Sequence, residues 1–119
     1  MDIGKVIVSL LTGYQVFPVV APQGTTGNYI VYQVISYLPT REKALSNLDV
    51  ASVQLTFIYS TYSTGITAAK AVRTILDGAK GTIASVEVDS IRYEDANDLF
   101  DLEQRSYIVS NTYTIRVKT

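Results

Sequence analysis

The first pattern along the chain is a set of apolar residues spaced three and four apart near the N-terminus. This spacing places the apolar side chains on one face of a helix, and we expect an amphipathic helix here. Gly13 follows the last of them and can end the helix by taking a left-handed backbone conformation. The apolar positions are Ile3, Val6, Ile7, Leu10 and Leu11.

The next segments read as an extended piece at residues 16–18, a loop at residues 21–28 and two strands. Residues 29–38 are mostly β-branched or aromatic with little alternation, which favours a strand covered on both faces. Residues 50–59 alternate apolar and polar positions, which predicts a strand with one face on the core. We expect a polar connection at residues 39–49.

A second helix and a hairpin complete the expected elements. The apolar stripe of the helix is formed by residues at helical spacing, with Ser63 or Thr64 as its cap and Gly78 just past its end. We expect two further strands at residues 82–93 and 107–117, joined by an acidic segment at residues 94–103. The stripe comprises Ile66, Ala69, Val72, Ile75 and Leu76.

The order of these elements predicts an α+β fold in one domain spanning residues 1–119. Consecutive strands with local connections usually pair antiparallel. We therefore expect a four-stranded, mainly antiparallel sheet that carries two helices on one face and includes a long C-terminal β-hairpin. The opposite face would be partly available to a neighbouring subunit.

Composition restricts the chemistry that the chain can perform. Hydrophobic residues make up 47% of its 119 residues, the formal net charge is -1, and it contains neither cysteine nor histidine. These values are typical of a folding chain and not of a disordered one. Without histidine and cysteine, the commonest general base, nucleophiles and metal ligands are missing. We expect no enzyme, no cofactor, no metal site and no segment that spans a membrane.

Three patterns allow both a functional and a structural interpretation. The acidic segment could bind calcium, but it lacks the mid-loop glycine of an EF-hand, and a solvated hairpin tip is favoured. Gly24 and Gly27 could flank a phosphate loop, but no lysine follows, and a turn is favoured. The tyrosines could stack on nucleic-acid bases, but ten basic against eleven acidic residues give no positive surplus, and a core or interface role is favoured.

A series of short motifs occurs in a fixed order along nearly the whole chain. Each motif is weak alone, and together they resemble the tail-completion protein family of tailed bacteriophages. The motifs are Val16-Phe17-Pro18, Pro22-Gln23-Gly24, the strand from Tyr29 to Ser36, the strand from Val53 to Ser60, the helix end from Ala71 to Gly78, Arg92-Tyr93-Glu94, and the segment from Asp101 to Tyr107.

The resemblance implies a structural virion protein that ends the tail tube and joins it to the head connector as a ring, with a hexamer expected. Its partners would be further copies of itself, the tail-tube protein and the head connector or stopper protein, with genomic DNA passing through the lumen as a non-specific polymer. Assembly would take place in the host cytoplasm, without a membrane. An acidic hairpin lining the lumen would repel DNA phosphates and let the genome slide.

We expect three contact surfaces: the polar connection around Arg41, the solvent-facing side of the strand at residues 50–59, and the acidic hairpin that contains Leu99 and Phe100. The competing interpretation is a cytoplasmic binding module or regulatory subunit that shares the α+β layout, because a fold does not fix a function. The residues expected at subunit or partner interfaces are Arg41, Glu42, Gln54, Asp98, Leu99, Phe100 and Tyr107.

Overall fold

A computed structural model describes residues 3–19, 27–38, 48–101 and 106–118. Within these ranges the chain forms two helices and one six-stranded sheet. The elements are α1 (Ile3–Leu10), β1 (Val16–Pro18), β2 (Tyr29–Leu38), β3 (Leu48–Tyr59), α2 (Tyr62–Leu76), β4 (Gly81–Ile83), β5 (Val86–Asp101) and β6 (Ser106–Lys118).

The strands lie in the order β1-β2-β3-β6-β5-β4. The short strand β1 pairs parallel with β2, and every other described pairing is antiparallel. The predicted α+β class is therefore confirmed, but the prediction of four strands is wrong. β1 and β4 each contain three residues, which is too short for an alternating pattern to appear in the sequence.

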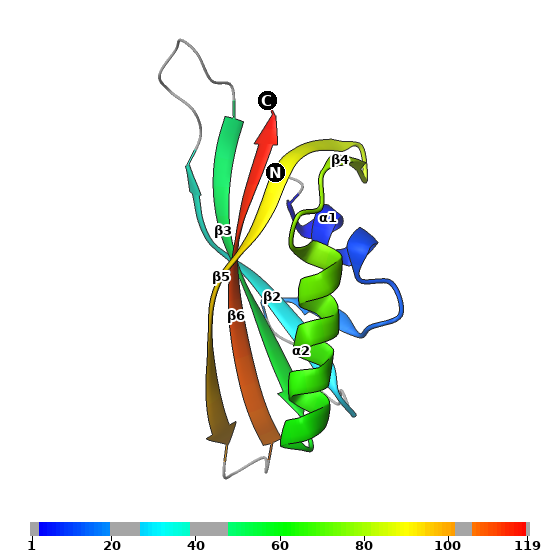
Figure 1. Cartoon of the computed structure of the whole chain (residues 1–119), viewed down its shortest axis with the longest axis vertical. Coiled ribbons are helices and arrows are strands. Elements are labelled where there is room, and N and C mark those ends of the chain that lie inside the picture. Colours follow the sequence, from blue (N-terminus) through cyan, green and yellow to red (C-terminus); the bar gives the residue numbers. More distant parts are fainter. Residues whose placement is uncertain (1–2, 20–26, 39–47, 102–105, 119) are drawn as a thin grey trace.

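Both helices lie on the same face of the twisted sheet, with α2 running along it and α1 next to β4 (Figure 1). α2 packs against β3, β5 and β6, whereas α1 packs against β2 and β4. The core between helices and sheet contains the fully buried side chains Ile3, Val6, Ile7, Leu11, Ile30, Val53, Leu55, Phe57, Val72, Leu76, Ile91, Tyr113 and Ile115.

The two central sequence patterns have different outcomes. The alternation predicted for residues 50–59 is confirmed, because each second residue of β3 from Ala51 to Phe57 is buried. The prediction that residues 29–38 are covered on both faces is wrong. Only Ile30 of β2 is buried, and Ile35 and Leu38 are 53% and 64% exposed. The described part of the chain carries helices on one face only, so an apolar strand can remain open on the other.

The start of α2 also differs from the prediction. Thr61 is the cap, and its hydroxyl accepts a hydrogen bond from the Thr64 backbone N–H at 3.4 Å. Ser63 and Thr64 lie inside the first turn. Gly78 has φ +87° directly after the C-cap Asp77, which confirms its predicted role as the terminating glycine.

Thr61→Ala is expected to lower the free energy of unfolding by about 1 kcal/mol, because it removes this capping acceptor. The measurement is a urea titration followed by far-ultraviolet circular dichroism. Ser63→Ala is the matched control, since Ser63 lies two residues past the cap, inside the first turn, and it should change the free energy by less than the cap variant. Equal effects of the two variants would contradict the assignment.

The C-terminal hairpin is longer than expected, and its acidic segment belongs mostly to a strand. β5 continues through residues 94–101, where Asp95 pairs with Thr112 and Phe100 with Tyr107. The expected solvated tip at these positions is therefore wrong. A pairing strand satisfies its backbone hydrogen bonds whatever the charge of its side chains, and acidic residues are tolerated at a sheet edge.

The expected strand at residues 82–93 is divided by a tight turn. Ala84 and Ser85 have φ +52° and +66°, and they connect β4 to β5. Two consecutive positive φ values are typical of the two-residue hairpin turn that glycine or asparagine normally occupies. Because neither residue is glycine or asparagine, the sequence does not indicate this turn.

Candidate assembly surfaces

The seven residues predicted at interfaces lie in separate parts of the molecule. Gln54 lies on β3, the backbones of Asp98, Leu99 and Phe100 lie near the end of β5, and Tyr107 lies near the start of β6. Arg41 and Glu42 are outside the described residues. The structure therefore does not gather them into one site, and whether they touch partners stays a prediction.

The first surface is the open face of the sheet, opposite the helices. Gln54 lies in the middle of it, with Gln33 of β2 opposite on one side and Thr112 of β6 on the other. The half-buried β3 residues of this face alternate with the core residues, and their β6 partners are mainly hydroxyl side chains. The face includes Ser52, Gln54, Thr56, Ile58, Ile108, Ser110, Thr112 and Thr114.

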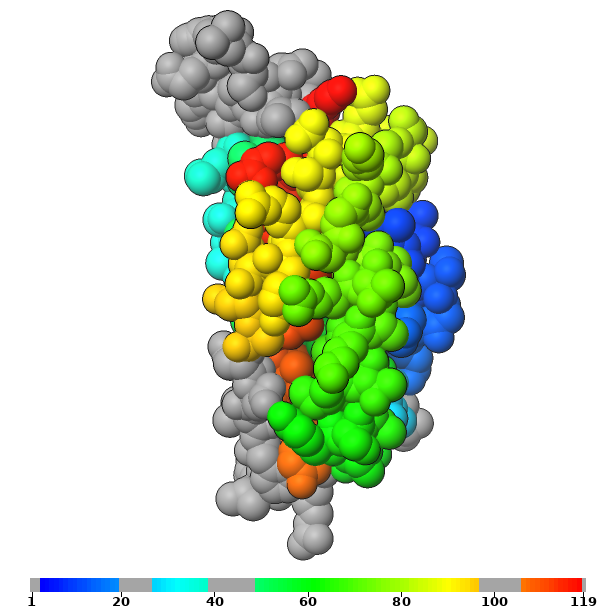
Figure 2. Space-filling model, viewed as in Figure 1, coloured from blue at the N-terminus to red at the C-terminus, as the bar shows by residue number. Residues whose placement is uncertain are grey.

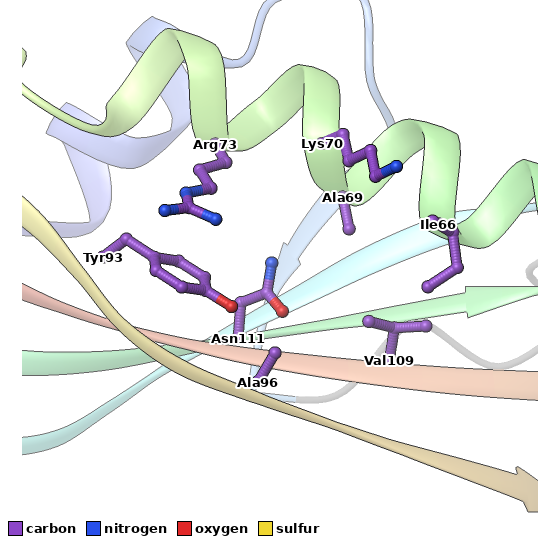
Figure 3. Close-up of a pocket in the computed structure, with 8 residues that line it drawn as sticks. All are labelled: Ile66, Ala69, Lys70, Arg73, Tyr93, Ala96, Val109 and Asn111. Atoms are coloured by element: carbon purple, nitrogen blue, oxygen red, sulfur yellow. The ribbon is translucent and has the colours of Figure 1, made fainter.

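The second surface is a groove between α2 and β5, with β6 visible at its floor (Figure 2). The cavity in this groove has a volume of about 180 Å³. Its lining comes from three elements and combines apolar side chains with two cations (Figure 3). The lining residues are Ile66, Ala69, Lys70, Arg73, Tyr93, Ala96, Val109 and Asn111.

Aromatic contacts fix one end of this groove. The Arg73 guanidinium carbon lies 3.9 Å from the centroid of the Tyr93 ring, which is a cation–π contact. The Tyr93 ring meets Tyr113 edge to face at a centroid distance of 5.7 Å. Arg73 is thus held over the groove by the aromatic pair below it.

Tyr113 is the largest fully buried side chain, and its hydroxyl has no hydrogen-bond partner among the described residues. Burial raises the pKa of Tyr113 to about 12, although the nearby Asn111 amide acts in the opposite direction. Burial has the larger effect, and the hydroxyl and the amide do not meet in hydrogen-bonding geometry. A buried hydroxyl without a partner destabilises the fold.

The C-terminal end of α2 is attached to the outer edge of β5. The Gly78 N–H donates to the Ile91 carbonyl at 2.8 Å, and the Tyr93 N–H donates to the Asp77 carboxylate at 3.0 Å. These bonds occupy backbone groups that an edge strand would otherwise present to solvent. The sequence showed Gly78 as a helix end but gave no sign that Asp77 binds a strand.

Tyrosines also mark both ends of the sheet. Tyr107 meets Tyr62 of α2 edge to face, with ring centroids 5.7 Å apart. Near the other end, the Tyr37 hydroxyl donates to the Asp49 carboxylate at 2.6 Å. This hydrogen bond raises the pKa of Tyr37 to about 12, and burial and the charge of Asp49 act in the same direction. These tyrosines serve packing and hydrogen bonding within the chain.

The described residues form neither a cluster of metal ligands nor a membrane-spanning helix. Among these residues, no group of three or more acidic, histidine or cysteine side chains is placed to hold a metal ion. None of the helices formed by these residues is long and apolar enough to cross a membrane.

A family model and a solved structure both match this chain. The family model described as "Tail completion protein gp17" matches residues 5–118. A chain in the structure titled "Virion of native gene transfer agent (GTA) particle" has a similar fold, with a TM-score of 0.73 and 18% sequence identity. The alignment covers 96% of this chain and 85% of that chain. No curated protein sequence matches.

Proposed function

This chain belongs to the tail completion protein gp17 family, so it is a structural phage tail protein of the virion, and we propose that it ends the tail tube and joins it to the head connector as a ring. The ring would be a hexamer. The observation that carries the proposal is the family match, which extends over residues 5–118 and thus includes every strand of the sheet.

The distribution of surfaces supports a ring. A closed ring of identical subunits joined head to tail needs two different contact patches on each subunit. The molecule is elongated, with extents of 50 × 25 × 23 Å, and it offers the open sheet face, the α2–β5 groove and the outer edge of β2 on different sides. Such a subunit can contact two neighbours and still present a surface to another protein.

The protein would work by assembly and not by catalysis. In this proposal one side of the ring binds the last layer of tail-tube protein and stops its growth, and the other side receives the head connector. Genomic DNA would pass through the lumen without sequence-specific contacts. The acidic residues of β5, including Glu94 and Asp95, would favour sliding if they face the lumen, because they repel phosphates.

The test is light scattering of the purified full chain over a range of concentrations, alone and mixed with the cognate tail-tube protein. We expect a mass of six subunits, or rings that cap tube ends in negative-stain electron micrographs. Tubes polymerised with the protein present should stop growing, whereas tubes without it should continue. A chain that stays monomeric and leaves tube growth unchanged would contradict the proposal and favour a cytoplasmic binding module.

A further inference from the structure

Among the described residues, the outer edge of β2 is a sheet edge without the usual protection. β1 pairs only with Ile30–Tyr32, so the segment from Gln33 to Leu38 has no strand beside it among the described residues. Edge strands normally carry charges or proline, which prevent pairing with other chains. Here the sequence contains no Asp, Glu, Lys or Arg from residue 6 to residue 40, and Ile35 and Leu38 are 53% and 64% exposed.

In β2, the backbone N–H and C=O groups of alternate residues point away from β3, toward the outer side of the sheet. The Ile30 N–H donates to the Gln15 carbonyl at 2.8 Å, and the Tyr32 carbonyl accepts from the Val19 N–H at 2.8 Å, so the outward-pointing groups belong to the even-numbered residues here. In an antiparallel strand this direction alternates. Val34 is therefore the next outward residue, and the irregularity between Val34 and Ser36 makes Tyr37 the following one.

The outer edge of β5, at the opposite side of the sheet, has its unpaired segment at a different place along the strand. On β5, the outward groups of Ile91 and Tyr93 are occupied by the end of α2. β4 pairs only with Val86–Val88. By the same alternation, the backbones of Ala96, Asp98 and Phe100 are outward positions that no described strand pairs. The free part of this edge is thus residues 95–101.

We propose that the outer edge of β2 pairs antiparallel with residues 95–101 of β5 from a second copy of the chain, so that the sheets of neighbouring subunits are continuous. The inference rests on the proposed ring and names its subunit contact. β2 and β5 run in opposite directions, because three antiparallel pairings separate them. A ring rotation about an axis to which the strands are tilted, as they are in a closed barrel, keeps these opposite directions, so β5 meets the neighbour's β2 antiparallel.

The charges of the two edges also favour pairing of β2 with β5 over pairing of β5 with another β5. Two β5 edges would place Asp95, Asp98 and Asp101 against the same residues of the other copy, and like charges oppose that pairing. The neutral β2 edge presents no such repulsion. The two free segments lie at different levels along the strands, and this offset is the kind of stagger that a closed curved sheet requires.

The first test places charge on the β2 edge. The double variant Ile35→Lys, Leu38→Lys changes two exposed side chains and should raise the concentration of half-assembly about tenfold or more. Ile75→Lys is the matched control, because Ile75 is 39% exposed on α2 and belongs to neither of the two free edge segments, and it should assemble as the unmodified chain does. Circular dichroism checks that each variant is folded. Assembly of the double variant at the unmodified concentration would overturn the inference.

The second test identifies the partner edge by cross-linking, which the absence of native cysteine makes specific. In one chain, positions 35 and 96 are separated by three strand spacings, about 14 Å, so a bismaleimide chosen to span less than this distance cannot join them internally. The double variant Ile35→Cys, Ala96→Cys, treated with a short bismaleimide, should give a ladder of covalent oligomers. Each single variant should stay monomeric on a denaturing gel.

The outcomes separate this inference from the proposed function. Dimers from Ile35→Cys alone would mean that β2 pairs with another β2, and would overturn the proposed contact. Rings in light scattering without any ladder would also overturn the contact while leaving the ring intact. A chain that forms neither rings nor ladders at any concentration, with or without tail tubes, would overturn both.

Discussion

Phe57→Ala is expected to lower the free energy of unfolding by about 3–5 kcal/mol. Phe57 is 0% exposed near the C-terminal end of β3, between the flanking strands β2 and β6, and its ring packs near Tyr59 with a centroid distance of 6.3 Å. Removing the ring loses its burial and leaves a cavity that rigid strands close poorly. This loss is a large part of the stability of about 5–15 kcal/mol of an ordinary domain.

The neighbouring residue provides the control for this variant. Thr56 lies one position away on β3, and its side chain is half-buried on the open face. Thr56→Ala should cost less than about 1 kcal/mol in the isolated subunit. Both values are obtained from urea titrations at a concentration where the chain is monomeric. Equal losses at the two positions would contradict the assignment of the helix-covered face as the core.

Alkaline pH is expected to destabilise the protein between pH 10 and 12. Tyr113 has its pKa raised to about 12 by burial, whereas an unfolded tyrosine titrates near pH 10. Its contribution is fully present below pH 10, where both states are protonated, and is lost as the pH rises toward 12, because the unfolded state releases its proton first. A difference of two pH units corresponds to at most about 3 kcal/mol.

Tyr113→Phe isolates this contribution. The variant should lose stability less steeply between pH 10 and 12, and at pH 7 it should be equal to or up to about 1 kcal/mol more stable than the unmodified chain. Tyr37 adds a smaller alkaline loss, because water screens its half-buried side chain. Thermal unfolding at a series of pH values measures both effects. A Tyr113→Phe variant that is clearly less stable at pH 7 would show that the hydroxyl has a partner, and Asn111 is the nearest polar candidate.

The sequence predicted the elements whose patterns reflect burial within one chain. The alternation of β3 and the helical stripes of α1 and α2 come directly from contact with the core, so these elements were predictable. Because helices cover only one face of β2, its apolar residues do not report burial within the subunit. An apolar residue that faces a neighbouring protein looks the same in a sequence as one that faces the core.

Other features depend on contacts that no local pattern contains. The turn at Ala84 and Ser85 uses positive φ values without glycine, and the cap at Thr61 competes with other hydroxyl residues nearby. The bond from Tyr93 to Asp77 joins residues 16 positions apart, and the groove is lined by residues from Ile66 to Asn111. Residue types alone do not indicate such a pair. The family resemblance, in contrast, needs only the order of motifs, and it was confirmed.

The unequal protection of the two sheet edges limits how this protein can misassemble. Amyloid-like growth needs a subunit that pairs on both sides without end. Here the bonds from Asp77 and Gly78 cover one side in part, and acidic residues occupy the remainder, so only the β2 side accepts an identical edge. Two subunits that join wrongly through β2 use up both permissive edges at once. Such dimers do not add to one another as amyloid subunits do, because each free edge that remains is an acidic β5 edge, and like charges oppose the pairing of two such edges.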